Sequence, residues 1–166
     1  MKYTCKICSS KHEYYFGIRA GASQTLSAIK KDDSKRVYEP EKDYYLVDKS
    51  IAVFPAIVEI GTEHETPFWY ETWVECNWEE FAGMSDRFKN EFGSFIEGKL
   101  YDNLVPYYHN SKGLKCRIIF SADMTATDRA QIIILEESII KRDQENGLSN
   151  NRLEELMNKI YHKDED

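Results

Sequence analysis

The segment from Tyr44 to Cys76 limits the choice of fold more than any other part of the chain. It is rich in β-branched and aromatic residues and is interrupted only at residues 48–49 and 61–67. That pattern predicts three successive strands joined by tight turns. Pro55 lies in the second of them and cannot donate a hydrogen bond to a neighbouring strand. We therefore expect this strand to lie at a sheet edge or to bulge at Pro55.

Later segments also have the composition of strands. Residues 115–120 form one, and residues 130–136 form another whose run Ile132 to Leu135 is uniformly apolar, which is typical of a strand buried on both faces. We expect these two strands to pair as a hairpin through residues 121–129. A shorter strand is predicted at residues 14–19.

Two main helices are predicted where an N-cap residue precedes helical periodicity. Asn77 is followed three residues later by a glutamate and then by apolar residues near helical spacing. The final helix is predicted over residues 149–162, with a capping box that begins at Asn151. Its apolar residues follow the period of a helix face: Leu153, Leu156, Met157, Ile160 and Tyr161. Ser23 also fits as the N-cap of a short helix.

The predicted strands follow one another with few helices between them, which indicates an antiparallel sheet with helices on one face. The expected fold is therefore α+β, with a mostly antiparallel sheet of about five to six strands and two main helices. A short N-terminal Cys-x-x-Cys knuckle, residues 1–13, precedes it. At 166 residues the chain fits a single domain, 1–166.

Charge and hydropathy exclude some classes of partner. The chain has 22 Lys and Arg against 29 Asp and Glu, a net charge of −7, so its field repels phosphate backbones and we expect no nucleic acid partner. It has no run of about eighteen apolar residues, so we expect no membrane span. The N-terminus lacks the apolar region of a signal peptide. We therefore expect a cytoplasmic protein whose cysteines stay reduced.

The N-terminal stretch YTCKICSSKH places Cys5 and Cys8 three positions apart, with His12 four residues further on. A Cys-x-x-Cys turn holds two thiolates at the separation that Zn²⁺ requires, and His12 is a candidate third ligand. No fourth ligand is evident, since the other candidates lie in predicted strands or loops: Cys76, Cys116, His64 and His109. Two other interpretations stay open, namely a redox pair and cysteines that merely pack as small apolar side chains.

Several motifs point to a known family when they are taken together. They are the Cys-x-x-Cys with its following histidine, Tyr45–Asp48, Phe54–Ile60, Phe68–Val74 and Gly98–Lys115. In combination they resemble DUF2199, an uncharacterised bacterial family. The resemblance covers nearly the whole chain and implies one intact domain in the bacterial cytoplasm, without an established activity.

The chain departs from that family pattern at three places. The resemblance implies a third cysteine at the position of Tyr45, a glycine at Ser9, and an Arg-Gly pair at Pro55–Ala56. This chain has therefore lost one metal ligand that the resemblance implies, together with two glycines that permit unusual backbone conformations.

The strand over residues 68–76 carries a second candidate site. Trp69, Glu71, Trp73 and Glu75 share one face of it, opposite a core-type face. This face is either an aromatic and acidic surface that binds a partner or a face covered by a helix. His109, in a predicted loop, is the candidate for a catalytic side chain, but no nucleophile stands next to it.

These observations favour a cytoplasmic, non-catalytic domain that binds another protein, with a zinc knuckle for stability. An acidic surface with aromatic side chains suits a basic partner, as in a regulatory or immunity role. The alternative is a small hydrolase or ligand-binding enzyme that uses His109 and carboxylates. An enzyme predicts a pocket that gathers these groups, whereas a binding module predicts a flat aromatic patch.

Overall fold

The structure is a computed structural model that describes residues 2–41, 44–88, 94–104, 106–121 and 129–162. The strands are β1 (Lys2–Thr4), β2 (Lys11–Glu13), β3 (Gly17–Ile18), β4 (Val37–Glu41), β5 (Tyr44–Val47), β6 (Ile51–Ile60), β7 (Phe68–Asn77), β8 (Phe95–Leu100), β9 (Lys115–Ile119) and β10 (Ala130–Ile134). The α-helices are α1 (Gln24–Asp32), α2 (Trp78–Phe88), α3 (Ile139–Asn146) and α4 (Asn150–Tyr161), and a 3₁₀ turn, η1, spans Ser34–Arg36.

Strands β6 to β10 close into a barrel. Each pairs antiparallel with the next along the chain, and β10 returns to pair with β6 in parallel. Strand β3 adds to β7 in parallel, and β5 and β4 extend the sheet from β6, so the described part of this sheet has eight strands. The α+β class is confirmed. Most strand pairings of the sheet are antiparallel, as expected, but the sheet is mixed and closed and its described part has more than the expected five to six strands.

The length of β6 explains how the barrel closes while the sheet also continues outward. One edge of β6 pairs with β7 along its whole length. The other edge is shared: β5 pairs with Ile51–Val53, and β10 pairs with Ala56–Val58. A long strand can therefore complete the barrel with one half and carry the extension with the other.

Pro55 lies at the boundary between these two partners. Opposite it on β7 is Trp73, whose carbonyl accepts a hydrogen bond from the Tyr101 N–H at 2.8 Å and so points away from β6. In such an antiparallel pair both residues turn their backbone polar groups outward, so the nitrogen of Pro55 faces the gap between β5 and β10. Strand β6 as a whole is not an edge strand and has no bulge against β7, but Pro55 itself lies at an unpaired point of the edge that β5 and β10 share. The missing donor therefore falls where none is needed.

The barrel interior is apolar. On β7 the side chains of Phe68, Tyr70 and Val74 face inward and are buried, which confirms the core face expected for this strand. Helix α2 follows β7 directly, and the Asn77 side chain accepts hydrogen bonds from the backbone N–H groups of Glu79 (2.8 Å) and Glu80 (3.2 Å), as its N-cap spacing predicts.

The sequence patterns missed some elements and misplaced others. The sequence patterns predicted neither strand β8 nor helix α3. The short strand expected at residues 14–19 is reduced to Gly17–Ile18, and most of the expected connection through residues 121–129 lies outside the described residues. Helix α4 starts from Ser149, whose Oγ accepts from the Arg152 N–H, so Asn151 is not the cap.

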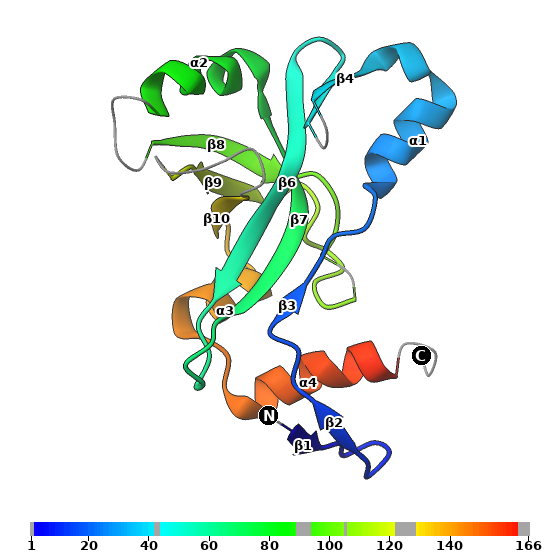
Figure 1. The fold of residues 1–166 in the computed structure, drawn as a ribbon, viewed down its shortest axis with the longest axis vertical. Coiled ribbons are helices and arrows are strands. Elements are labelled where there is room, and N and C mark those ends of the chain that lie inside the picture. The colour runs from blue at the N-terminus through cyan, green and yellow to red at the C-terminus, as the bar shows by residue number, and fades with distance from the viewer. Residues whose placement is uncertain (1, 42–43, 89–93, 105, 122–128, 163–166) are drawn as a thin grey trace.

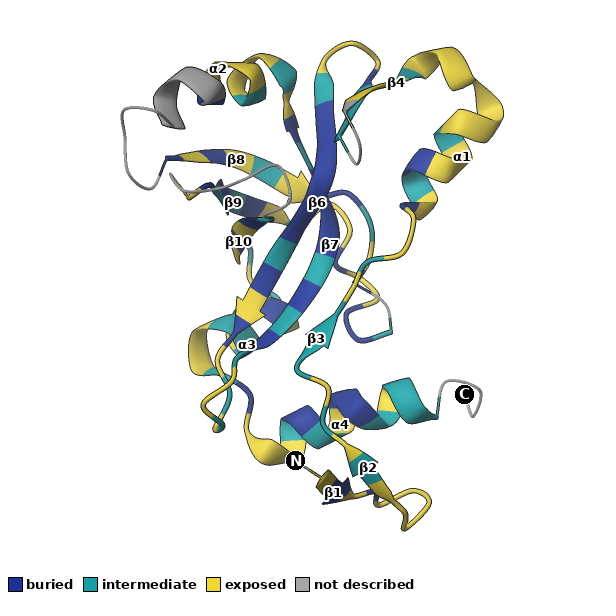
Figure 2. Cartoon of the chain, in the orientation of Figure 1, coloured by how far each residue is buried: buried dark blue, intermediate teal, exposed yellow. Residues whose placement is uncertain are grey.

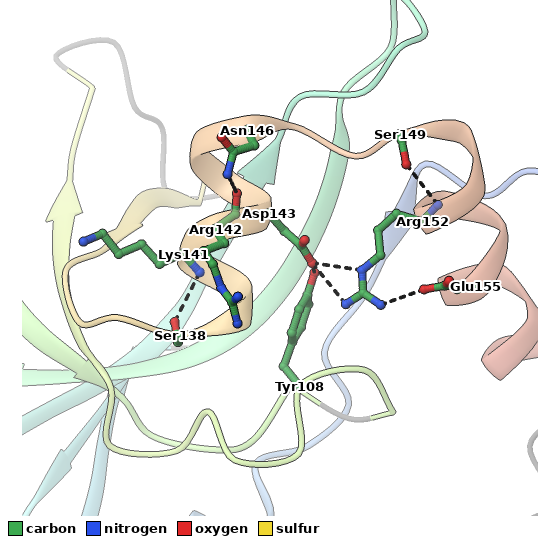
Figure 3. Close-up of polar contacts among 9 residues, drawn as sticks. All are labelled: Tyr108, Ser138, Lys141, Arg142, Asp143, Asn146, Ser149, Arg152 and Glu155. Carbon is green, nitrogen blue, oxygen red and sulfur yellow. Dashed lines mark hydrogen bonds and ion pairs between the residues drawn. The ribbon is translucent and has the colours of Figure 1, made fainter.

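Polar contacts join α4 to the rest of the chain. The Tyr108 hydroxyl donates to Asp143 Oδ2 of α3 at 2.8 Å, and Arg152 of α4 donates to the same oxygen at 3.2 and 3.3 Å (Figure 3). The inward face of α4 is buried, with Leu153, Leu156 and Met157 in the core (Figure 2). The hairpin of β1 and β2 lies beside α4, so the N-terminal segment of the described chain contacts its C-terminal helix (Figure 1).

Candidate metal centre

The N-terminal knuckle is a tight turn between β1 and β2. The Ser9 N–H donates to the Cys5 carbonyl, and the Cys5 N–H donates to the Ser10 carbonyl, both at 2.9 Å. Ser9 has a φ of 59°, in the left-handed region that favours glycine. The turn places Cys5, Cys8 and His12 on one side of the hairpin.

Helix α4 brings a fourth donor to these three. His162 is the C-cap residue of α4, and its Nε2 lies 3.2 Å from Cys5 Sγ. One turn earlier, Asn158 Oδ1 accepts from Cys5 Sγ at 3.2 Å and from the Tyr3 hydroxyl at 2.8 Å. The ring of His12 stacks on Tyr161, with a centroid distance of 4.1 Å. The hairpin is thus fixed against the end of α4 by polar and aromatic contacts.

The four donor atoms form one compact group. Cys5 Sγ, Cys8 Sγ and one ring nitrogen each of His12 and His162 all lie within 4.8 Å of one another, and Cys8 Sγ is 3.1 Å from His12 Nε2. In a tetrahedral zinc site with Zn–S of about 2.3 Å and Zn–N of about 2.0–2.1 Å, neighbouring donors are about 3.3–3.8 Å apart. The group could therefore hold a metal ion after small side-chain adjustments.

The surroundings of the thiols favour a bound cation. Cys5 is 1% exposed, and the Ile7 N–H points to its Sγ at 3.4 Å, a contact that also suits a thiolate. Hydrogen bonds from the Ser10 backbone and then from the His12 ring lower the pKa of Cys8 to about 6. Two sulfurs and two imidazole nitrogens in this arrangement are a donor set typical of zinc.

His162 is the donor that sequence reasoning missed. It stands at the end of the predicted final helix, and no local sequence pattern relates it to Cys5. The other candidates for a fourth ligand lie elsewhere among the described residues: Cys76 on β7, Cys116 on β9, His64 between Tyr14 and Phe16, and His109 in an exposed loop.

The position of Tyr45 also bears on the ligand set. Its ring packs on Trp73 at 5.8 Å and belongs to a different core cluster from Cys5. Strand β5 is paired with β4, which lies at the opposite end of the molecule from β1 and β2 (Figure 1). A tyrosine at this position therefore removes no donor from the group at the knuckle.

The outer face of β7 is largely covered. Trp73 is 9% exposed, packs with Leu26 of α1, and donates from Nε1 to the Gly21 carbonyl at 2.9 Å. Trp69 is half-buried against Gly17, where any side chain would collide with its ring. The role of this face in binding a partner stays a prediction.

The two glutamates of that face have different surroundings. Glu71 accepts from Arg129 Nε at 2.8 Å and from the Ala20 N–H at 3.1 Å. Burial raises the pKa of Glu75, and the nearby Lys99 and Lys112 only partly oppose that shift. Glu71 is thus fixed by an ion pair, whereas Glu75 is partly desolvated.

A cavity of about 420 Å³ lies next to this face. Its lining includes Glu71, Trp73 and Asp102 but, among the residues that the structure describes, no histidine. His109 is exposed. The structure thus does not bring His109 together with the carboxylates of this cavity.

Within the described residues, no helix has both the length and the apolar character needed to cross a membrane.

Comparison with known proteins identifies the family but no activity. No curated protein and no solved structure matches the chain. The sequence pattern of a family described as an uncharacterized protein conserved in bacteria, DUF2199, matches residues 4–148. That range includes the knuckle and the whole barrel but ends before α4 and His162. The chain belongs to the DUF2199 family.

Proposed function

We propose that the protein is a zinc-binding domain in which one structural Zn²⁺ joins the N-terminal hairpin to the end of α4. The observation that carries this proposal is the convergence of Cys5, Cys8, His12 and His162, from both ends of the described chain, within 4.8 Å. If Cys5 and Cys8 only packed as small apolar side chains, nothing would require two histidine rings beside them. Tetrahedral Cys₂His₂ groups are typical of structural zinc.

The donor set favours a structural ion over a catalytic one. A catalytic zinc keeps one coordination position open for water or substrate, whereas four protein donors fill a tetrahedral site. The Ile7 N–H supplies an outer contact that would hold the Cys5 thiolate in place around the ion. The expected chemical role of the ion is therefore to hold two chain segments together.

For the domain as a whole, we propose a cytoplasmic, non-catalytic role in binding a basic protein partner, regulatory or immunity-like. The net charge of −7 supports this, because it favours encounter with a cationic surface. The exposure of His109, away from the carboxylates beside Trp73, weighs against a small hydrolase that combines them. A pull-down with purified protein, compared at low and high salt, tests the partner's charge.

The zinc proposal predicts the metal content of the purified protein. Elemental analysis of protein prepared without chelator should find one zinc per chain. His162→Ala should lower the zinc affinity at least about 10–100-fold, the loss that even an outer-shell partner typically causes. His109→Ala is the matched control, because His109 is exposed and outside the donor group, and it should leave the affinity unchanged.

A thermal measurement checks the structural role. Chelation should lower the Tm of the wild-type protein and leave the Tm of His162→Ala almost unchanged, because that variant has little zinc to lose. Wild-type protein without stoichiometric zinc, even after zinc is added, would refute the proposal.

A further inference from the structure

We propose that this centre is a peroxide-sensitive switch, in which a hydroperoxide joins Cys5 to Cys8 in a disulfide and thereby releases the zinc. The inference rests on the proposed zinc centre and adds its regulation. Loss of the ion would remove one connection between the hairpin and the end of α4, since the two sides of the centre come from these two elements.

The two thiols are placed to form a disulfide without a change of fold. They belong to one turn, closed by the Ser9 N–H to Cys5 carbonyl bond, and their sulfurs lie within 4.8 Å of each other. Rotation of the side chains about χ1 has to bring the sulfurs to about 2.05 Å. A Cys-x-x-Cys turn is the arrangement in which such pairs close in redox proteins.

The exposure of the two cysteines sets the order of events. Cys8 is exposed and Cys5 is 1% exposed, so a peroxide reaches Cys8 first. Cys5 lies behind it as the second thiol that resolves the oxidised sulfur. An oxidised cysteine with a neighbouring thiol stops at the disulfide instead of proceeding to irreversible acids.

The other cysteines do not compete for the oxidant. Cys76 and Cys116 are buried in β7 and β9, where desolvation raises the pKa of both thiols to about 12. They remain protonated near neutral pH, and a thiol reacts with peroxide far more slowly than a thiolate. The reactivity of the described chain toward peroxide is thus concentrated at the knuckle.

The chemistry balances with the peroxide as the only oxidant. The Cys8 thiolate attacks a peroxide oxygen, the O–O bond breaks, and the products are a sulfenic acid and hydroxide. The Cys5 thiolate then attacks the Cys8 sulfur, an S–S bond forms, and a second hydroxide leaves. Two electrons pass from the sulfurs to the peroxide, and two protons convert the hydroxides to water.

The zinc cannot remain after that step. The disulfide removes both anionic ligands, and only the neutral imidazoles of His12 and His162 are left. These two come from different elements and would have to hold the ion alone. The contacts of Asn158 with Tyr3 and of Tyr161 with Glu13 also join the hairpin to α4, so release of the ion would loosen this connection and leave the barrel unchanged.

Zinc-loaded protein treated with hydrogen peroxide tests the inference. A chromogenic chelator should record release of one zinc per chain, and peptide mapping should find a Cys5–Cys8 disulfide. A thiol reductant and added zinc should restore the loaded protein. The double variant Cys76→Ala, Cys116→Ala should release zinc at the wild-type rate.

Cys8→His provides the matched comparison. It offers the metal a nitrogen in place of a sulfur and leaves Cys5 as the single thiol of the centre. Its zinc should be released at least about tenfold more slowly, because no disulfide can form. Zinc retained by wild-type protein under peroxide, or released with Cys76 or Cys116 oxidised and no Cys5–Cys8 disulfide, would overturn the switch. A protein that never binds zinc would instead refute the proposed metal centre, so the two failures are distinct.

Discussion

Ser9 carries a backbone conformation that its side chain does not favour. Its φ of 59° places it in the left-handed region, where a β-carbon costs about 1–2 kcal/mol. It follows the second cysteine of the knuckle, where the resemblance to the family implies glycine. The strain is thus located in the turn that supplies two of the four donors, and relieving it should strengthen the site.

The variant Ser9→Gly tests this directly. We expect it to raise the free energy of unfolding by up to about 1 kcal/mol, because the relief of strain exceeds the added entropy of glycine in the unfolded chain. Ser10→Gly is the control, since Ser10 is not among the residues with positive φ, and it should be neutral or destabilising. Denaturant unfolding of both variants with zinc present measures the difference, and equal effects would contradict the account.

Glu75 makes stability depend on pH in a defined direction. Its pKa is raised in the folded protein, so the folded state binds a proton more readily than the unfolded state does. The contribution of this group to stability therefore falls as pH rises from the ordinary carboxyl range, about pH 4, through the raised pKa. Glu75→Gln should raise the Tm at pH 7.5 and change it little at pH 3.5. A Tm that falls at pH 7.5 would show that the lysines beside Glu75 outweigh its desolvation.

At the scale of elements, local patterns identified the helices that have strong caps and apolar faces. Helix α4 was predicted because its periodicity is contained in its own sequence. Strand β8 was missed because Gly98 breaks its pattern. A β-carbon there would lie 2.4 Å from the Glu75 carbonyl and 2.6 Å from a methyl group of Ile118. The glycine is required by strands on either side, which a local pattern does not reveal.

The start of α4 yields a prediction that distinguishes Ser149 from Asn151 as the N-cap residue. Ser149→Ala should destabilise the protein by about 1 kcal/mol, because the hydroxyl accepts from the Arg152 N–H. Asn151→Ala, at the position that the sequence favoured, should cost much less, since Asn151 lies inside the helix and is exposed. Thermal unfolding of the two variants at one pH compares them. An equal loss in both would contradict the cap seen at Ser149.

At the scale of the whole molecule, closure could not be predicted from the sequence. The parallel pairing of β10 with β6 joins Ile132 to Val58, and the four-donor group joins Cys5 to His162, which are 157 positions apart. Both contacts depend on how distant segments pack. The three donors of the hairpin were recognisable because they are close together in the sequence, whereas the fourth became visible only with the fold.

A bound zinc ion would connect the N-terminal hairpin and the end of α4 directly, so it should oppose their local opening most. We expect zinc to slow amide hydrogen exchange most in β1, β2 and the last turn of α4. The amides of β6 and β7, which pair along their full length, should be the slowest with or without zinc. Uniform protection of all elements by zinc would contradict a local clamp.

The separation of Cys5 from His162 also has a consequence for biosynthesis. A ribosome that adds about 5–20 residues per second needs roughly 8–30 s to make the 157 residues between them. During that interval a nascent chain presents two thiols and one imidazole without their partner. At the proposed zinc site, binding by all four donors would therefore be among the last events of maturation, because it would require translation to reach the end of α4.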